Sequence, residues 1–392
     1  MTISRKFLRR AFFVSFIAFL LLAFELSSYF YLKCCSEIIY PAARHIIDPL
    51  NKDWLDRFYR TTFDRELGWV PRANTRGEKI NSIGRRWTWS TDEFGARRHG
   101  GQAGTKNPAI ATYGDSWVFG DEVDDRATWQ FHVSVLLDKT VANFGVGGYG
   151  TDQALLRFDR TLSQGILPRV AILGVTYENH NRVFSRYRPY YNPHAGIRLG
   201  FKPQAYLDDQ GELRFRPSEL RAPEYDKSIL RELAEASRNG DFWAGFLPRF
   251  EFPYSVNLMQ GARIRLCGDY PWIPTCDFGG APNWNRPETR SIMTALVREF
   301  VRKCKSNGIF PVLLFFPDRK PPSYALYLEV LRKELSQEGV LVLDFSEAPG
   351  YTPSGVSVRR IGGHLSARGN RLVGEYLARQ LADLPVLKAK RR

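Results

Sequence analysis

The segment ATYGDSWVFGDEV, residues 111–123, decides how the rest of the chain is interpreted. A β-prone run over 108–113 leads into a Gly-Asp-Ser turn that ends at Ser116, and a helical pattern begins within 122–137. A serine at a strand-to-helix turn presents its hydroxyl at the edge of a sheet, where backbone N–H groups can converge on an oxyanion. The segment therefore predicts an α/β fold with Ser116 as a candidate nucleophile, which requires a base from elsewhere in the chain.

From residue 108 onward, apolar strand-like runs alternate with helical patterns. The strand-like runs lie at 109–114, 141–146, 170–175, 310–316 and 340–345. The helical patterns lie at about 126–137, 152–163, 287–306, 322–337 and 366–382. This alternation predicts a three-layer α/β fold, with a central parallel sheet covered by helices on both faces. Ligands on such sheets bind outside the carboxyl ends of the strands, which is where Ser116 lies.

One long interval after the third strand breaks this alternation. It holds a predicted hairpin at 206–215, a predicted helix at 224–238 and a Trp- and Pro-rich run to Trp284. We interpret it as an insertion that forms a lid or a substrate platform, with a surface elaboration that only packs as the alternative. The expected organisation is a cytoplasmic stub and membrane anchor at 1–32, a connector and N-terminal extension at 33–107, a first core part at 108–182, the insertion at 183–286, a second core part at 287–383 and a basic tail at 384–392.

The N-terminal segment has the composition of a membrane anchor. Residues 11–32 read AFFVSFIAFLLLAFELSSYFYL, with Glu25 as the one charged residue, and Tyr29 and Tyr31 lie near the far end like an interfacial belt. A cleaved signal peptide is the alternative, because the uncharged part ends at Phe24. Four basic residues precede the run and predict a cytoplasmic N-terminus, which places the body of the chain in the periplasm or outside the cell.

The formal net charge of +15 is not spread evenly along the chain. Each end carries a cluster of four basic residues, formed by Arg5, Lys6, Arg9 and Arg10 and by Lys388, Lys390, Arg391 and Arg392. No nucleic-acid-binding motif accompanies this charge, so no nucleic-acid partner is expected. A weak attraction to anionic lipid or to an anionic glycan fits the distribution better.

Cysteines and histidines give little sign of a structural or metal framework. Cys267 and Cys276 lie in the loop-rich stretch CGDYPWIPTC, where they form a small disulfide in an oxidising compartment or remain two unrelated thiols. Glu178, His180 and His194 match no zinc spacing. We therefore expect no metal and no other cofactor.

Three further strand ends carry groups suited to chemistry beside a serine. After the second strand, the glycine-rich turn at 143–150 lets the backbone approach a ligand and aim an N–H group at it. After the third strand, the stretch GVTYENHN at 174–181 offers side-chain amides. His364 lies in GGHLSARGN at 362–370, just before the last helix, for which Ser366 is the expected N-cap. A loop histidine at this edge of the sheet is suited to removing the serine proton.

These four blocks resemble those of the SGNH (GDSL-type) esterases and acyltransferases. The resemblance covers about 108–382, apart from the insertion. It implies that Ser116 is the nucleophile and that the Asn-x-Gly-x-x-Gly turn places the N–H of Gly148 in the oxyanion hole. The closest match to the third block is Asn179-His180, which implies that the Asn179 amide is a further oxyanion donor. The last block implies that His364 is the general base.

The implied chemistry is acyl transfer, with each oxyanion donor contributing around 3 kcal/mol. The family's acid usually lies two or three residues before the histidine, where this chain has Gly362 and Ile361. Loss of the acid of a triad lowers kcat by roughly 10⁴-fold. A Ser116–His364 dyad is therefore expected, with a backbone carbonyl or Asp344 as the substitute partner of the histidine.

The expected function is that of a membrane-anchored, extracytoplasmic serine esterase or O-acyltransferase. Its substrates would be acyl esters, above all acetyl esters, of an envelope or extracellular glycan, and a membrane partner would supply acyl groups for transfer. Arg186, Tyr187 and Trp284 are candidates for substrate contact. Packing within the insertion is the alternative for Tyr187 and Trp284, and a solvated face is the alternative for Arg186. A lipid or small-ester esterase is a second possibility. A catalytically degraded SGNH-fold binding or assembly protein is a third, which the position of His364 relative to Ser116 distinguishes.

Overall fold

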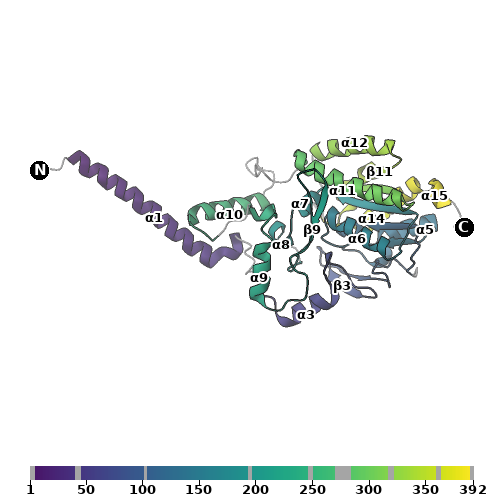
Figure 1. The fold of residues 1–392 in the computed structure, drawn as a ribbon, viewed down its shortest axis with the longest axis horizontal. Helices are drawn as coiled ribbons and strands as arrows, with labels where there is room; N and C mark the ends of the chain where they lie inside the picture. Colours follow the sequence, from purple (N-terminus) through teal and green to yellow (C-terminus); the bar gives the residue numbers. More distant parts are fainter. Residues whose placement is uncertain are drawn as a thin grey trace. The chain divides into compact units, whose positions relative to one another are not determined.

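The computed structural model describes residues 5–39, 46–100, 104–192, 197–245, 250–269, 284–316, 322–358 and 363–388 (Figure 1). These residues form two compact units. We call the first the anchor unit; it comprises Met1–Asn51, Tyr187–Leu199 and Asp226–Ala281. The second, the core unit, comprises Lys52–Arg186, Gly200–Tyr225 and Pro282–Arg392. The expected insertion is therefore divided, since its β-hairpin belongs to the core unit and its helices belong to the anchor unit.

A five-stranded parallel sheet forms the centre of the core unit, in the order β11-β10-β7-β5-β6. Its strands are β5 (Ile110–Tyr113), β6 (Val141–Asn143), β7 (Val170–Thr176), β10 (Phe310–Phe316) and β11 (Leu341–Asp344). Each comes from a continuous apolar run, as expected for strands that are buried on both faces. The chain passes from β5 to β6 at one edge of the sheet and from β7 to β10 on the other side, so the connections reverse between β5 and β7. Ligands bind at such a reversal in open α/β sheets.

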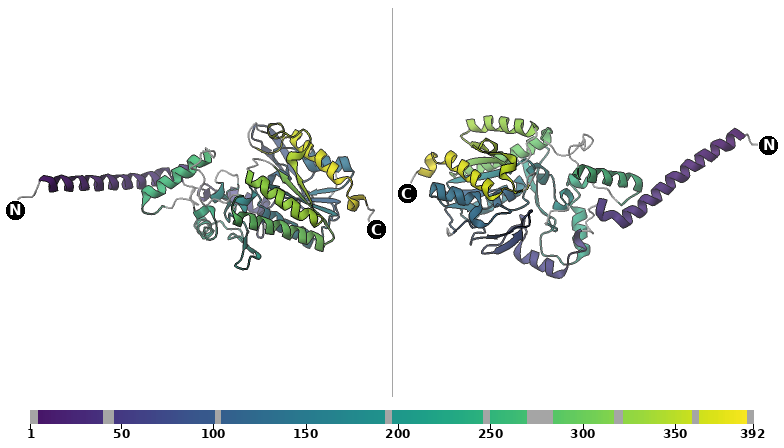
Figure 2. Two further views of the ribbon diagram at one scale, coloured as in Figure 1. Left: turned by 90° about the horizontal axis from the view of Figure 1, so that it is seen from above. Right: turned by 180° about the vertical axis from the view of Figure 1, so that it is seen from behind.

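Helices cover both faces of the sheet (Figure 2). Successive residues of the strands pack into these opposite helical layers. On one face, residues such as Ile110 and Val170 pack with α5 (Trp129–Leu137) and α14 (Ala367–Leu381). On the other face, residues such as Ala111 and Ala171 pack with α6 (Thr151–Ser163), α11 (Pro287–Ser306) and α12 (Pro322–Gln337). The predicted three-layer α/β fold is confirmed.

Eight short helices complete the described residues of the two units. They are α4 (Ser116–Phe119), η1 (Asp125–Ala127), α7 (Asn179–Val183), α8 (Arg188–Tyr191), η2 (Trp243–Gly245), η4 (Phe345–Glu347), α13 (Pro353–Val356) and α15 (Pro385–Lys388). The N-terminal extension contributes α3 (Lys52–Thr61) and two antiparallel pairs, β1 (Phe63–Asp64) with β2 (Gly68–Trp69) and β3 (Arg76–Ile80) with β4 (Arg86–Ser90).

Within the insertion, the predicted hairpin is confirmed as β8 (Gln204–Leu207) paired with β9 (Leu213–Arg216), and the predicted helix as α9 (Lys227–Ala236). The sequence did not lead us to expect α10 (Tyr254–Asp269), which lies in the Trp- and Pro-rich run. Strand β6 also ends earlier than expected. The side chain of Asn143 binds the carbonyl groups of Val118 and Phe119, and its Oδ1 accepts the N–H of Gly145, so the chain leaves the sheet there.

The anchor unit begins with α1 (Arg5–Ile39). Over Arg5–Cys34 this is the one helix among the described residues that is long and apolar enough to cross a membrane, by length and composition. Most of its large apolar side chains are exposed, including Phe12, Phe13 and Leu21 at more than 60%. A helix with exposed apolar side chains all round suits a lipid environment rather than water.

A fully buried ion pair ties β8 to the sheet's helical layer within the core unit. The Lys202 ammonium lies 2.6 Å from Asp152 Oδ2 and also donates to the carbonyl of Ser185 at 3.0 Å. Both charged side chains are completely inaccessible. Burial raises the pKa of Asp152, against the lowering effect of Lys202. Removal of either partner alone would leave a desolvated polar group in the interior.

Replacement of Lys202 by Met is expected to lower the free energy of unfolding by roughly 3–5 kcal/mol, because Asp152 loses its partner. In the double variant Lys202→Met/Asp152→Leu most of this stability should return, as an apolar pair of similar volume replaces the ions. Urea denaturation followed by circular dichroism measures both. The exposed pair Arg214–Asp208 of the same hairpin supplies the control, and Arg214→Ala should barely move the midpoint. A double variant no more stable than the single one would contradict this account.

Candidate active site

The turn that carries Ser116 is held in place by the buried carboxylate of Asp115. Asp115 is the N-cap of α4, and its Oδ1 accepts the N–H of Trp117 at 2.9 Å. Its Oδ2 accepts three further bonds from the end of β7 and from α7: Thr176 Oγ1 at 2.8 Å, Asn179 Nδ2 at 3.0 Å and Arg182 Nη1 at 2.8 Å. Asp115 therefore joins the turn after β5, which carries Ser116, to the end of the neighbouring strand β7.

Glycines allow α4 to lie directly against three strand ends. A Cβ atom on Gly145 would overlap the backbone nitrogen of Phe119, and one on Gly174 would overlap the side chain of Val118. A Cβ atom on Gly114 would overlap Val118 as well. The Gly-Asp-Ser and Asn-x-Gly patterns thus have a steric cause, since any side chain there would push Ser116 away from the sheet.

Two N–H groups remain suited to an oxyanion. Among the described residues, no hydrogen bond satisfies the N–H of Ser116 or that of Gly148. Gly148 has a φ of +81°, a left-handed conformation that favours glycine. The expected third donor is engaged elsewhere: the Asn179 amide donates to Asp115 at 3.0 Å and its Oδ1 accepts the N–H of Thr176 at 2.9 Å. In this structure Asn179 braces Asp115 rather than offering its amide to a ligand.

The histidine has a carboxylate partner that the sequence did not point to. His364 Nδ1 lies 3.0 Å from Glu122 Oε1, and the other oxygen of Glu122 accepts the hydroxyl of Ser82 at 2.7 Å. Asp344, the acid considered from the sequence, instead caps η4 by accepting the N–H and hydroxyl of Ser346. The carboxylate that contacts His364 therefore lies in the loop after α4, and not at the end of β11.

The tautomer that this contact selects is the one a serine nucleophile needs. A carboxylate at Nδ1 keeps the proton on that nitrogen and leaves Nε2 to accept a proton. Among the described residues, no hydrogen bond joins Ser116 Oγ to the His364 ring. The ring is 29% exposed, and Asp115, which precedes Ser116, is close enough for its charge to affect the histidine.

Charge and burial act oppositely on the two partners. Burial alone would lower the pKa of His364, but the hydrogen bond to Glu122 and the charges of Asp121, Glu122 and Asp115 outweigh it and raise this pKa above its ordinary value. Burial would raise the pKa of Glu122, but the bonds from His364 and Ser82 outweigh it and lower this pKa to about 2. The pair is therefore an imidazolium and a carboxylate in mildly acidic solution.

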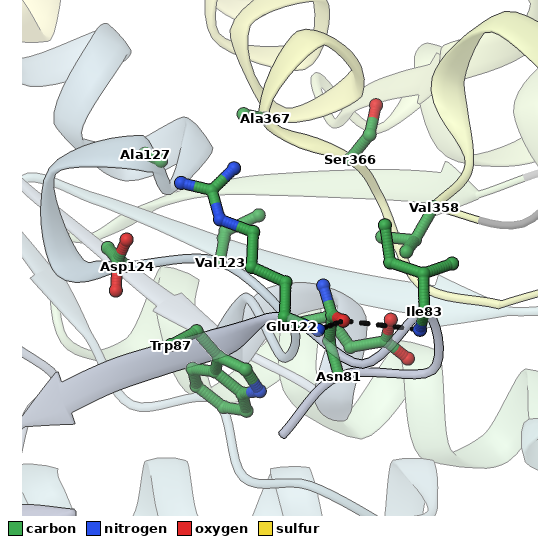
Figure 3. Close-up of a pocket in the computed structure, with 11 residues that line it drawn as sticks. Asn81, Ile83, Trp87, Glu122, Val123, Asp124, Ala127, Val358, Ser366 and Ala367 are labelled. Carbon is green, nitrogen blue, oxygen red and sulfur yellow. Dashed lines mark hydrogen bonds between the residues drawn. The ribbon is translucent and has the colours of Figure 1, made fainter. Parts of the chain in front are cut away.

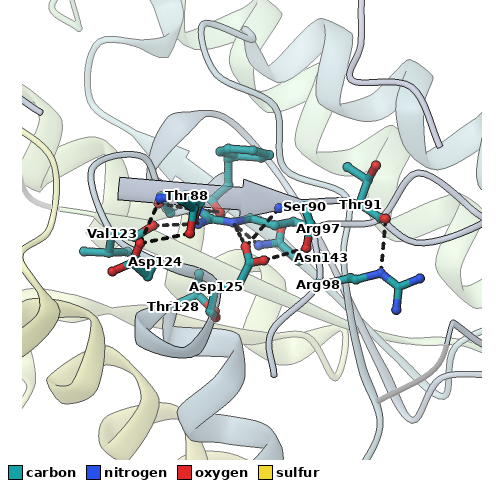
Figure 4. A network of polar contacts seen from close by, with 12 residues as sticks. Thr88, Ser90, Thr91, Arg97, Arg98, Val123, Asp124, Asp125, Thr128 and Asn143 are labelled. Atoms are coloured by element: carbon teal, nitrogen blue, oxygen red, sulfur yellow. Dashed lines mark hydrogen bonds and ion pairs between the residues drawn. The ribbon is translucent and has the colours of Figure 1, made fainter. Parts of the chain in front are cut away.

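The loop that carries Glu122 is organised by the buried guanidinium of Arg97 (Figure 4). Arg97 donates to the carbonyl of Phe119 at 2.8 Å, to that of Val123 at 2.6 Å and to Asp125 Oδ1 at 3.1 Å. The bonds bracket Glu122, which has a φ of +74°. A non-glycine residue in this region costs about 1–3 kcal/mol and persists only where its surroundings hold it. Arg97 supplies that restraint from the N-terminal extension.

A small pocket of about 150 Å³ lies beside Glu122 (Figure 3). Its apolar lining includes Ile83, Val123 and Val358, and Arg85 and Trp87 add polar groups. Ser116 and His364 are not among the residues that line it. The pocket therefore borders Glu122 but reaches neither Ser116 nor His364.

The structure places the expected substrate-contact residues in the interior. Arg186 is buried and pairs with Glu219 at 2.5 Å. Tyr187 is fully buried, with its hydroxyl donating to the carbonyl of Arg198. Trp284 is buried against Tyr324 and Tyr327. Tyr187 and Trp284 therefore pack in the interior, which was the alternative for them, whereas Arg186 is buried in an ion pair rather than on the solvated face that was its alternative. The expected disulfide between Cys267 and Cys276 lies outside the described residues, since the structure describes neither the side chain of Cys267 nor any part of Cys276.

Substitution of Glu122 by Gln is expected to lower the pKa of His364, because the favourable charge and hydrogen bond are lost while burial remains. Histidine-selective NMR titration measures this pKa, and Asp344→Asn is the control that should leave the His364 pKa unchanged.

The raised His364 pKa stabilises the fold below about pH 6.5, and this contribution is lost as pH rises through that pKa. The lowered Glu122 pKa stabilises the fold above about 4.5 and this is lost as pH falls toward 2. The stability difference between wild type and Glu122→Gln should thus be largest between these limits. A lowered His364 pKa in Asp344→Asn, with no change in Glu122→Gln, would contradict the assignment of Glu122 as the partner of His364.

Substitution of Arg97 by Met is expected to release the Glu122 loop. The His364 pKa should fall toward its value in Glu122→Gln, and the double variant should show little further change, because both substitutions break one coupled unit. The orphaned carbonyl groups should lower stability by roughly 1–3 kcal/mol each. Arg98→Met is the matched control, since Arg98 is partly exposed and donates to Thr91 rather than to the loop. A wild-type His364 pKa in Arg97→Met would refute the positioning role.

Comparison with known proteins gives structural likeness alone. No family model and no curated protein matches the sequence. The similar solved structures include a protein assigned to the lipolytic G-D-S-L family from Desulfitobacterium hafniense DCB-2 (14% identity, 70% of this chain and 99% of that chain, TM-score 0.35). A second is a protein assigned as an acylhydrolase from Bacteroides fragilis NCTC 9343 (10% identity, 71% of this chain and 88% of that chain, TM-score 0.33). A third is an acetyl xylan esterase from the rumen bacterium Butyrivibrio proteoclasticus (10% identity, 75% of this chain and 67% of that chain, TM-score 0.34). The chain has a three-layer α/β fold with a Gly-Asp-Ser turn after β5, an Asn-x-Gly turn after β6 and His364 just before α14, which is the arrangement that the resemblance to SGNH (GDSL-type) enzymes predicts.

Proposed function

We propose that this chain is a membrane-anchored serine esterase or O-acyltransferase with the triad Ser116, His364 and Glu122. The contact between His364 Nδ1 and Glu122 Oε1 at 3.0 Å carries the proposal. It supplies the acid whose loss would otherwise favour a non-catalytic binding protein. It also fixes the tautomer in which Nε2 accepts a proton.

In the proposed reaction, Ser116 Oγ bonds to the ester carbonyl carbon while its proton passes to His364 Nε2. The carbonyl π electrons move to oxygen, and the N–H groups of Ser116 and Gly148 bind that oxyanion. Collapse breaks the bond to the alcohol, which leaves with the proton from His364, and an acyl-serine remains. Water then completes hydrolysis, or a second hydroxyl completes transfer, again with His364 as the base. The reaction requires Ser116 Oγ and His364 Nε2 to come within hydrogen-bond reach when substrate binds, since catalytic hydrogen bonds often tighten only in the complex.

The proposed substrates are acetyl or other acyl esters of an envelope or extracellular glycan. The support is the apolar α1 preceded by basic residues, which favours an extracytoplasmic core unit. A membrane partner that delivers acyl groups belongs to the transferase form of the proposal. A lipid or small-ester esterase remains the alternative, because the same triad serves any ester that reaches Ser116.

Labelling with a fluorophosphonate tests the triad, since the reagent reacts with an activated serine. The full-length chain in detergent should label, and Ser116→Ala should not. His364→Ala and Glu122→Gln should label 10²–10⁴-fold more slowly, as loss of base or acid does in related triads. Asp344→Asn, the matched carboxylate control, should label at the wild-type rate.

Two results would decide against the proposal. Equal labelling of Ser116→Ala would remove Ser116 as the nucleophile. Wild-type labelling of Glu122→Gln together with slow labelling of Asp344→Asn would transfer the acid role to Asp344. Circular dichroism of each variant checks that a loss of labelling does not come from unfolding.

A further inference from the structure

The single carboxylate within the apolar stretch of α1 is bound by the start of another helix of the anchor unit. Glu25 Oε2 accepts the N–H of Tyr254 at 2.8 Å, and the carboxylate also accepts the N–H and hydroxyl of Ser255. Tyr254 and Ser255 are the first two residues of α10. A helix N-terminus has unpaired N–H groups and a partial positive charge, both of which stabilise a carboxylate. Glu25 therefore acts as the cap of α10.

The position of Glu25 along α1 fixes the depth of this contact. The uncharged run from Ala11 to Phe24 is about 20 Å long at ~1.5 Å per residue, which is shorter than the roughly 30 Å of a bilayer's hydrocarbon core. A membrane-spanning α1 must therefore use residues up to about Leu32, with Glu25 inside the apolar region. A carboxylate there is costly unless it is paired or hydrogen-bonded. The start of α10 supplies those hydrogen bonds, so it lies at the same depth.

The contact extends along one face of α1. Ser28 and Leu32, which follow Glu25 at helical spacing, are buried, and the Ser28 hydroxyl is satisfied by the carbonyl of Phe24. The Tyr29 ring packs against Phe250 and Tyr254, with ring centres 5.4 and 5.1 Å apart. The segment before α10 is thus also joined to α1. Other large side chains of α1 at this level, Leu26 and Phe30, are more than half exposed.

The start of α10 adds its own exposed apolar side chains beside this contact. They are Phe250, Phe252, Val256 and Met259, with exposed fractions of 42%, 73%, 51% and 56%. Residues 252–262 contain no charged side chain, and Glu251 and Arg263 flank them. Such a surface in water would be unfavourable, whereas it continues the lipid-compatible surface of α1. The uncharged stretch is too short to span a bilayer, which is typical of an interfacial or re-entrant element.

We propose that residues 250–262, which we call the α10 dip, form a second membrane-contacting element that inserts shallowly into one leaflet. The occupant of its apolar surface is lipid acyl chain. The leaflet is the one at the C-terminal end of α1, because Glu25 lies in that half of the helix. The inference rests on the membrane anchoring of α1 in the proposed function and is independent of the triad.

Hydrophobic photolabelling of the full-length chain tests this inference. The purified protein is reconstituted at one chain per lipid nanodisc, with a carbene-generating reagent dissolved in the bilayer, and is then digested with trypsin. Label is expected on the tryptic peptide 11–33, from α1, and on 250–263, which covers the α10 dip. The peptide 232–238, from α9 of the same unit, should carry none.

Paired variants show whether the exposed apolar side chains are responsible. Phe252→Glu/Met259→Glu should reduce label on 250–263 at least fivefold and leave 11–33 unchanged. Ile229→Glu, which adds a charge at a 40%-exposed apolar residue of α9, should change neither. Label on 11–33 without label on 250–263 would overturn the α10 dip alone. Absence of label from 11–33 would overturn the anchoring on which the inference rests.

Discussion

The arrangement of the candidate active site depends on one buried guanidinium. Arg97 belongs to the N-terminal extension, yet its hydrogen bonds hold the backbone on both sides of Glu122. Asn143 binds the same stretch from the other side, through the carbonyl groups that end α4. The loop between nucleophile and acid is thus clamped by side chains from the extension and from the sheet. The extension thus contributes a side chain that holds the candidate site.

This clamp explains how a carboxylate can serve His364 without lying next to it in sequence. A triad is defined by the positions of its groups, and unrelated chains assemble it from different orders of residues. Here the left-handed backbone of Glu122 turns its side chain toward the C-terminal turn, and Ser82 holds the second carboxylate oxygen. The histidine turn then needs no acid of its own, which accounts for Gly362 and Ile361 at those positions.

Much of the fold was predictable from the sequence because it follows from local patterns. Continuous apolar runs gave the five strands, and the glycines around α4 gave the turns that carry Ser116 and Gly148. The role of Glu122 was not predictable, because nothing near it in sequence marks a contact with a residue 242 positions away. The one hint in the sequence was an acidic residue in the loop that follows Ser116. That hint can be interpreted only when the contacts of Arg97 with this loop are known. Arg186, Tyr187 and Trp284 had the chemistry of a binding surface, but burial depends on tertiary packing that composition does not encode.

The short spacing between Ser116 and Glu122 has a consequence for how such a site can change over time. Two of the three groups belong to one segment, folded against the sheet by its own glycines and caps. The C-terminal region contributes only an imidazole, presented just before α14 and steadied by Asn370, which accepts the N–H of Trp129. Under the proposed triad, no proton-transfer role falls to the residues just before His364 in the sequence. Substitutions there that leave His364 bonded to Glu122 are therefore compatible with the proposed reaction.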